Sequence, residues 1–143
     1  MQSSNTANQL MKKLNYPVKR LMQAIVAACC ISWAAAAETN VTHLTAQQAE
    51  KLIAAKKVVV LDIRTPKEFA ASHIAGATNI NFRAPDFQNA LAALDKNQTY
   101  VLHCASGNRS TQSLQTFSKL GFTSVFHLDG GIKAWQKAKL PVD

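Results

Sequence analysis

The chain has 143 residues, enough for one domain, and its 48% hydrophobic and 17% charged residues are typical of a globular protein rather than a disordered one. Part of the formal net charge of +8 comes from the first 37 residues, which hold four basic residues and no acidic one. The other twelve basic and eight acidic residues are scattered, without the basic stripe and stacking aromatics of a nucleic-acid-binding surface. The charge therefore argues against a nucleic-acid partner and favours small anions.

The first segment, residues 12–37, has the three parts of an export signal. A basic stretch that ends at Arg20 precedes an apolar run, Leu21 to Trp33, and small residues follow up to Ala37. We expect a signal peptide at residues 1–37 and a mature, periplasmic domain at residues 38–143.

Other interpretations of this segment stay open. It could be an uncleaved anchor helix, although its apolar run is shorter than the roughly 20 residues that a membrane span needs. It could also belong to a lipoprotein anchored at Cys29, because Val26-Ala27-Ala28-Cys29 is similar to the box that precedes a lipidated bacterial cysteine. The start codon is open as well, since Met11 with its two lysines opens a leader more typically than Met1 does.

Helical and extended patterns alternate after the leader. Thr45 and Gln48 form a capping box that starts a helix, and the apolar run interrupted only by Asp62 is typical of a strand buried on both faces of a parallel sheet. The expected elements are a helix from Thr45, a strand at 58–63, a helical turn at 68–72, extended chain at 79–81, a helix from Pro85, a strand at 100–103, a helix closed by Gly121, a strand at 124–128 and a last helix ended by Pro141. This order predicts an α/β domain with a central parallel sheet and helices on both faces.

Cleavage of the leader would remove two of the three cysteines and leave Cys104 as the single thiol. A lone cysteine in an oxidising compartment is either buried and inert or used for its chemistry. Cys104 directly follows the strand at 100–103 and precedes a helix, and α/β domains bind ligands where strands end and helices begin. Its position therefore favours a functional role.

The residues after Cys104 favour an ionised sulfur. They are mostly small or polar, so backbone N–H groups can surround the sulfur, and Gly107 permits the positive φ that such a loop requires. These donors, the positive end of the next helix and the Arg109 guanidinium would lower the pKa of the thiol. Cys104 is thus the candidate nucleophile, in a cradle suited to an anion.

Three segments carry a resemblance to one family. The loop Cys104-Ala105-Ser106-Gly107-Asn108-Arg109-Ser110 resembles the active-site loop of rhodanese domains. Leu61 to Phe69, continued by His73 to Ile80, is similar to the first rhodanese signature, and Leu128-Asp129-Gly130-Gly131 with Trp135 is similar to the second. The resemblance covers residues 41–140, and with its leader the chain most resembles the small periplasmic rhodaneses of the phage-shock type.

The resemblance implies a rhodanese-like fold and a sulfurtransferase. Its Cys104 thiolate would take a sulfane sulfur from a small anionic donor, such as thiosulfate or a persulfide, and pass it to cyanide or a thiol. The substrate-binding residues would be Ala105, Ser106, Gly107, Asn108, Arg109 and Ser110. Asp62 and Arg64 would form a structural ion pair. We expect a monomer that needs no metal or organic cofactor and that contacts no membrane after leader removal.

One position departs from the family pattern, and two other functions remain to be weighed. Several thiosulfate-using relatives carry a basic residue where this chain has Ala105, so the natural donor is open. A cysteine phosphatase has five residues between cysteine and arginine, whereas four separate Cys104 from Arg109, which predicts a tighter ring. A non-catalytic rhodanese-like module would lack the cysteine, which is present here.

The histidines show no metal-ligand spacing, and His73 is expected to form a hydrogen bond.

Overall fold

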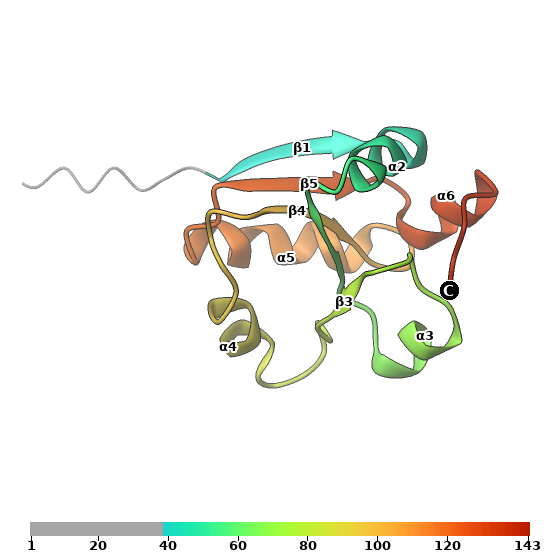
Figure 1. Cartoon of the computed structure of the whole chain (residues 1–143). Coiled ribbons are helices and arrows are strands. Elements are labelled where there is room, and N and C mark those ends of the chain that lie inside the picture. The colour runs from blue at the N-terminus through green and yellow to red at the C-terminus, as the bar shows by residue number, and fades with distance from the viewer. Residues whose placement is uncertain (1–38) are drawn as a thin grey trace, which may run out of the picture. The chain divides into compact units, whose positions relative to one another are not determined.

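The computed structural model describes residues 39–143 (Figure 1). The predicted leader at 1–37, with Cys29, lies outside the described residues. Within the described part, no helix has both the length and the hydrophobicity needed to cross a membrane. The elements are β1 (Asn40–Leu44), α2 (Ala46–Ala54), β2 (Val59–Asp62), α3 (Pro66–Ala71), β3 (Thr78–Asn79), α4 (Phe87–Ala92), β4 (Thr99–His103), α5 (Asn108–Lys119), β5 (Ser124–Leu128) and α6 (Gly131–Lys137).

The five strands form one parallel sheet in the order β1-β5-β4-β2-β3. β4 lies in the middle, with Val101 paired to Val60 of β2 on one side and to Phe126 of β5 on the other. A parallel sheet needs crossover helices, which cover its faces. The expected α/β class with a central parallel sheet is thereby confirmed.

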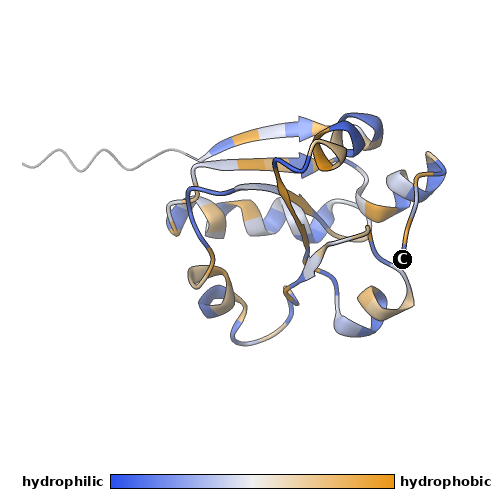
Figure 2. Cartoon of the chain, in the orientation of Figure 1, coloured by the Kyte–Doolittle hydropathy of each residue, from blue (hydrophilic) through white to orange (hydrophobic). Residues whose placement is uncertain are grey.

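Alternation along the strands divides the core between the two faces of the sheet. Leu61 and Leu102 pack with α4 and α5, whereas Val60 and Val101 pack with α2 and α6. Figure 2 shows hydrophobic colour along most of β2, which agrees with the burial of this strand. Cys104 belongs to the cluster on the α5 face, so the candidate nucleophile is anchored in the core.

Capping boxes start two of the helices. Thr45 and Gln48 begin α2 as predicted, and Thr65 with Glu68 begins α3 in the same way. Because Thr65 caps the helix and Pro66 occupies its first turn, α3 starts before the predicted Glu68.

One sequence-based expectation was wrong, and one strand was missed. Pro85 does not start a helix; it lies in a turn held by the hydrogen bond from Phe87 N to the Ala84 carbonyl, and α4 begins at Phe87. β1 was not expected, because its sequence shows no apolar run. It is an edge strand whose residues are exposed, except for buried Leu44 and half-buried Val41. Its sequence therefore shows little of the hydrophobic pattern that identifies a buried strand.

Candidate active site

Cys104 lies where β4 ends and the loop toward α5 begins. Only 1% of its surface is exposed. Gly107, the N-cap of α5, has φ +98°, a left-handed conformation that glycine adopts without steric cost. This turn bends the chain back over the sulfur and helps to bury Cys104.

The loop directs donors at the sulfur. The Gly107 N–H donates to Cys104 Sγ at 3.2 Å, and the Ser110 hydroxyl lies at 3.5 Å from the same atom. Burial alone would raise the pKa of the Cys104 thiol. Hydrogen bonds from the Ser110 side chain and from the backbone N–H groups of Ser110, Ser106 and Gly107 outweigh burial and lower that pKa. The site therefore stabilises a thiolate.

The loop before α6 fixes the backbone of Cys104 from the other side. Ile132 N donates to the Cys104 carbonyl at 2.9 Å, and Lys133 N donates to the Ala105 carbonyl at 3.1 Å. A Cβ on Gly131 would lie 2.4 Å from the Cys104 carbonyl oxygen. The close approach of the two loops thus requires glycine at position 131.

Arg109 points its guanidinium at Glu68 of α3. Arg109 donates two parallel hydrogen bonds to the Glu68 carboxylate, from Nη1 to Oε2 at 2.9 Å and from Nη2 to Oε1 at 2.7 Å. Hydrogen bonds to Glu68 raise the pKa of Arg109, against partial burial, and the nearby Cys104 sulfur adds to the rise. Hydrogen bonds from Arg109 likewise hold the pKa of Glu68 far below its usual range. The Nη1–Nη2 edge of Arg109 is therefore occupied by Glu68.

The other loop residues differ in exposure. Ser106 and Asn108 are exposed, Ala105 is half-buried, and Ser110 is fully buried. Asn108 accepts a hydrogen bond from Gln112 on the next turn of α5.

Asp62 and Arg64 form an ion pair with an N–O distance of 2.6 Å, and neither is exposed by more than 5%. Arg64 Nη2 also donates to the Ser72 carbonyl at 2.7 Å, which holds the segment after α3. His103 is fully buried beside this pair, and its Nε2 lies 3.8 Å from Asp62 Oδ2 without a hydrogen-bond partner. Its Nδ1 lies 3.2 Å from the Cys104 carbonyl oxygen. Burial lowers the pKa of His103, although Asp62 acts in the opposite sense. His73 Nδ1 lies 3.1 Å from the Phe69 carbonyl, as expected of a hydrogen-bonding residue.

Three residues that sequence spacing did not bring together form a network next to the loop. His43 and His127 are register partners on β1 and β5, and the Nδ1 atoms of both lie near Asp129 Oδ1, at 2.7 and 2.9 Å. Their donor atoms lie within 4.8 Å of one another, a spacing that a metal ion could bridge. Because these atoms already pair with each other, we describe the group as a hydrogen-bond network. His127 Nε2 continues it to Ser110 Oγ at 2.8 Å.

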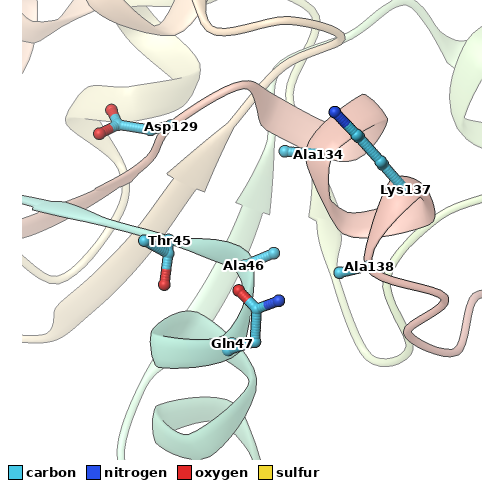
Figure 3. A pocket seen from close by; sticks show the side chains of 7 residues that line it. All are labelled: Thr45, Ala46, Gln47, Asp129, Ala134, Lys137 and Ala138. Carbon is cyan, nitrogen blue, oxygen red and sulfur yellow. The ribbon is translucent and has the colours of Figure 1, made fainter.

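Two surface hollows lie near this network. One, of about 400 Å³, lies between the start of α2 and α6 and is lined mainly by alanine methyl groups and by Asp129 and Lys137 (Figure 3). Cys104 does not line it. The other, of about 540 Å³, is lined by the exposed side of the Cys104 loop together with His127 and Asp129. The second hollow thus lies beside the loop of the candidate nucleophile, although Cys104 itself does not line it.

A family model for the rhodanese-like domain matches residues 45–138. The chain belongs to the rhodanese-like domain family. This rhodanese-like domain is 33% identical over 96 residues to the thiosulfate sulfurtransferase GlpE of Shewanella oneidensis, which covers 67% of this chain and 93% of that protein. Sulfurtransferase relatives thus support a sulfurtransferase at the level of the family.

Two other relatives extend the comparison. The probable adenylyltransferase/sulfurtransferase MoeZ of Mycobacterium tuberculosis is 38% identical over 86 residues, which is 60% of this chain. The chain spans only 22% of the length of MoeZ. The crystal structure of a rhodanese-related protein from Thermoplasma volcanium superposes with a TM-score of 0.64 and 29% identity, covering 71% of this chain and 97% of that one.

Sequence reasoning about this rhodanese-like domain missed three residues around the Cys104 loop. Glu68 could be recognised as a capping residue, but its partner Arg109 is 41 positions away. His127 and Asp129 carried no metal or catalytic spacing, and only the fold brings them to Ser110. A histidine two residues before the predicted loop at Asp129 was the available signal, because alternation along β5 could have placed it on the α5 face.

Proposed function

We propose that the protein is a sulfurtransferase that carries sulfur on Cys104. The Cys104 thiolate attacks the outer sulfur of a donor such as thiosulfate, so a sulfur–sulfur bond to Cys104 forms while the donor's bond breaks and sulfite leaves with its electron pair. The resulting persulfide anion then gives its outer sulfur to cyanide or a thiolate, and the Cys104 thiolate returns. This is covalent nucleophilic catalysis without a change in net charge.

The observation that carries this proposal is the pair of donors aimed at one sulfur. Gly107 N and Ser110 Oγ lie 3.2 and 3.5 Å from Cys104 Sγ, at the end of a buried strand. Donors that stabilise a thiolate also stabilise a persulfide anion, whose charge lies one atom further out. Because Cys104 is 1% exposed, small donors and acceptors fit this proposal better than bulky ones.

The arginine of the loop favours sulfur transfer over phosphate hydrolysis. A cysteine phosphatase uses its loop arginine to bind two phosphate oxygens, through two parallel N–H donors on one edge of the guanidinium. In this chain Arg109 Nη1 and Nη2 both donate to Glu68. The tighter four-residue spacing between Cys104 and Arg109 supports the same choice.

A paired assay tests the function. The wild-type protein is expected to form thiocyanate from thiosulfate and cyanide and to leave p-nitrophenyl phosphate unchanged. Intact-mass spectrometry after incubation with the donor should show a gain of one sulfur atom. Cys104→Ser should lose both the thiocyanate product and the added mass, since residues 38–143 contain no other thiol. Faster hydrolysis of the phosphate ester than transfer of sulfur would make the phosphatase the better assignment.

We propose that the mature protein begins at Glu38 in the periplasm and acts there as a monomer. The basic, apolar and small-residue parts of the leader support this location. N-terminal sequencing of periplasmic protein is expected to read from Glu38. A lipidated Cys29 or an intact leader would contradict export by cleavage after Ala37.

A further inference from the structure

We propose that His127 is a positioning residue for Cys104, which takes up the thiol proton through Ser110 and so turns the Ser110 hydroxyl toward the sulfur. The inference rests on the proposed function, in which Cys104 is the nucleophile. It concerns a side chain on β5, outside the loop that surrounds the sulfur.

A continuous line of short contacts joins a carboxylate to the sulfur. Asp129 Oδ1 lies 2.9 Å from His127 Nδ1, His127 Nε2 lies 2.8 Å from Ser110 Oγ, and Ser110 Oγ lies 3.5 Å from Cys104 Sγ. Ser110 is 0% exposed and the His127 side chain only 3%. Ser110 and His127 are therefore largely shielded from water, and their polar groups mostly satisfy one another.

The position of the hydrogen on the His127 ring affects which acceptor the Ser110 hydroxyl binds. Ser110 has one O–H, yet three acceptors lie within its reach: the Gly107 carbonyl at 2.9 Å, His127 Nε2 and Cys104 Sγ. When His127 carries its hydrogen on Nδ1 and donates it to Asp129, Nε2 accepts and competes for the Ser110 hydroxyl. When Nε2 carries a hydrogen, it donates to Ser110 Oγ, and the Ser110 hydroxyl is left with the Gly107 carbonyl and the sulfur as its acceptors. Of these two, a Cys104 thiolate is the charged acceptor and attracts the hydroxyl hydrogen more strongly.

Proton transfer along this line balances without an outside reactant. The S–H bond of Cys104 breaks and its proton goes to Ser110 Oγ, while the original Ser110 proton goes to His127 Nε2. A neutral thiol and a neutral imidazole thereby become a thiolate and an imidazolium. The carboxylate of Asp129 stabilises the imidazolium at Nδ1, and Ser110 donates to the thiolate.

The charged groups around His127 come from three elements. Asp129 follows β5, His43 lies on β1 with its ring centroid 5.0 Å away, and Cys104 follows β4. From α5, uncharged Ser110 and Thr111 face the ring. Because His43 shares Asp129 Oδ1, a proton on His43 draws on the same carboxylate and opposes a positive charge on His127.

The rate of alkylation of Cys104 by iodoacetamide, measured against pH on the purified protein, tests the proposal. Iodoacetamide reacts with the thiolate, so the midpoint of the profile reports ionisation of the sulfur. His127→Gln is expected to move this midpoint upward by about one pH unit and to slow the reaction near pH 6 by roughly fivefold to tenfold. His73→Gln, the matched control away from the loop, should keep the wild-type profile.

A double-mutant cycle separates a relay through Ser110 from a direct effect of charge. In a Ser110→Ala background, His127→Gln should cause no further shift of the midpoint, because the connection is already cut. Asp129→Asn, which changes a side chain that is 55% exposed, should shift the midpoint in the same direction and provides the test if His127→Gln fails to fold by near-UV circular dichroism. Unchanged midpoints in His127→Gln and Asp129→Asn, or a His127→Gln shift that survives Ser110→Ala, would overturn the relay.

Alkylation needs no sulfur donor, so the two proposals can fail separately. A protein that forms no thiocyanate but shows the shifted midpoints would contradict the sulfurtransferase function and support the relay. A protein that forms thiocyanate with identical midpoints in wild type and both variants would support the function and reject the relay.

Discussion

At the scale of single residues, Gly131 meets two separate physical demands. Its φ of +57° is a conformation that other residues rarely adopt. A Cβ at this position would also lie 2.4 Å from the Cys104 carbonyl oxygen and 2.9 Å from the Ala105 carbonyl carbon. Because both contacts are with backbone, no side-chain rotation can relieve them, and the loop of the nucleophile would have to move.

Gly131→Ala is therefore expected to lower the free energy of unfolding by about 2 to 4 kcal/mol and to reduce thiocyanate formation strongly. Gly121→Ala is the matched control, since Gly121 also has a positive φ, +80°, but a Cβ there would meet nothing within 4 Å. It should cost only about 1 kcal/mol and leave activity near the wild-type level. Urea titration measures the stability, and equal losses in the two variants would show that the close approach is unimportant.

The sequence predicted some residues of the site better than others. Cys104 and Gly107 could be recognised because the loop is contiguous and its chemistry is local. His127 could not be recognised, because its proposed role depends on its contact with Ser110 of α5, which packs against β5 only in the folded domain. Glu68 has a visible capping role with Thr65, but its bond to Arg109 is a property of the fold.

At the scale of elements, one contact joins α3 to α5 beside the sulfur. The Glu68 carboxylate neutralises Arg109, and the two side chains are 36% and 15% exposed. The same carboxylate accepts from the Thr65 N–H at 3.0 Å as part of the capping box of α3. Glutamine preserves a capping box, so the charge can be removed without losing the cap.

Glu68→Gln should lower the KM for thiosulfate, because it leaves the Arg109 charge without its partner next to the anion site. An attraction of about 1 kcal/mol corresponds to a roughly fivefold change, with kcat nearly unaffected. Arg109→Ala should raise the KM by a similar or larger factor and retain some transfer, since the backbone donors remain. Lys119→Ala, at the far end of α5, removes one positive charge and is the control for the change in net charge in Arg109→Ala. A rise of the KM in Glu68→Gln would show that the pair itself positions the substrate.

Elements that are marked by a local sequence pattern were predicted, whereas β1 and the start of α4 carry no pattern that decides their structure. The capping box at Thr45 and the apolar run of β2 are local, and both elements form as expected. β1 has a mixed polar sequence because it is an edge strand, and only its pairing with β5 makes it extended. Pro85 is compatible with the first turn of a helix and with a tight turn, and local preference alone does not separate these.

At the scale of the whole molecule, the buried His103 links stability to pH. Burial lowers the pKa of His103 in the folded protein. Above about pH 6.5 the side chain is neutral in both states, so it contributes no pH dependence there. As the pH falls below this value, the unfolded chain binds a proton that the folded protein does not, and the folded state loses stability.

The free energy of unfolding should accordingly fall between pH 7 and pH 5, with a contribution from His103 of up to about 1.4 kcal/mol per pH unit. His103→Gln should show a shallower slope over this range, whatever its stability at pH 8. Denaturant titrations at several pH values provide the measurement. Parallel slopes in the two proteins would mean that His103 binds its proton in the folded state as readily as in the unfolded chain.

The pairing of β1 with β5 has a consequence for when the loop of Cys104 becomes fixed. Residues 40–44 align with residues 124–128, so this edge of the sheet closes only after almost the entire domain has left the ribosome or translocation channel. Closing such a long loop costs entropy before its contacts compensate, so we place this ladder late in folding. A partly synthesised chain already contains Cys104, but it lacks the later backbone N–H groups of Ile132 and Lys133 that fix the loop. Completion of the fold thus sets the time at which the backbone of Cys104 and Ala105 becomes fixed.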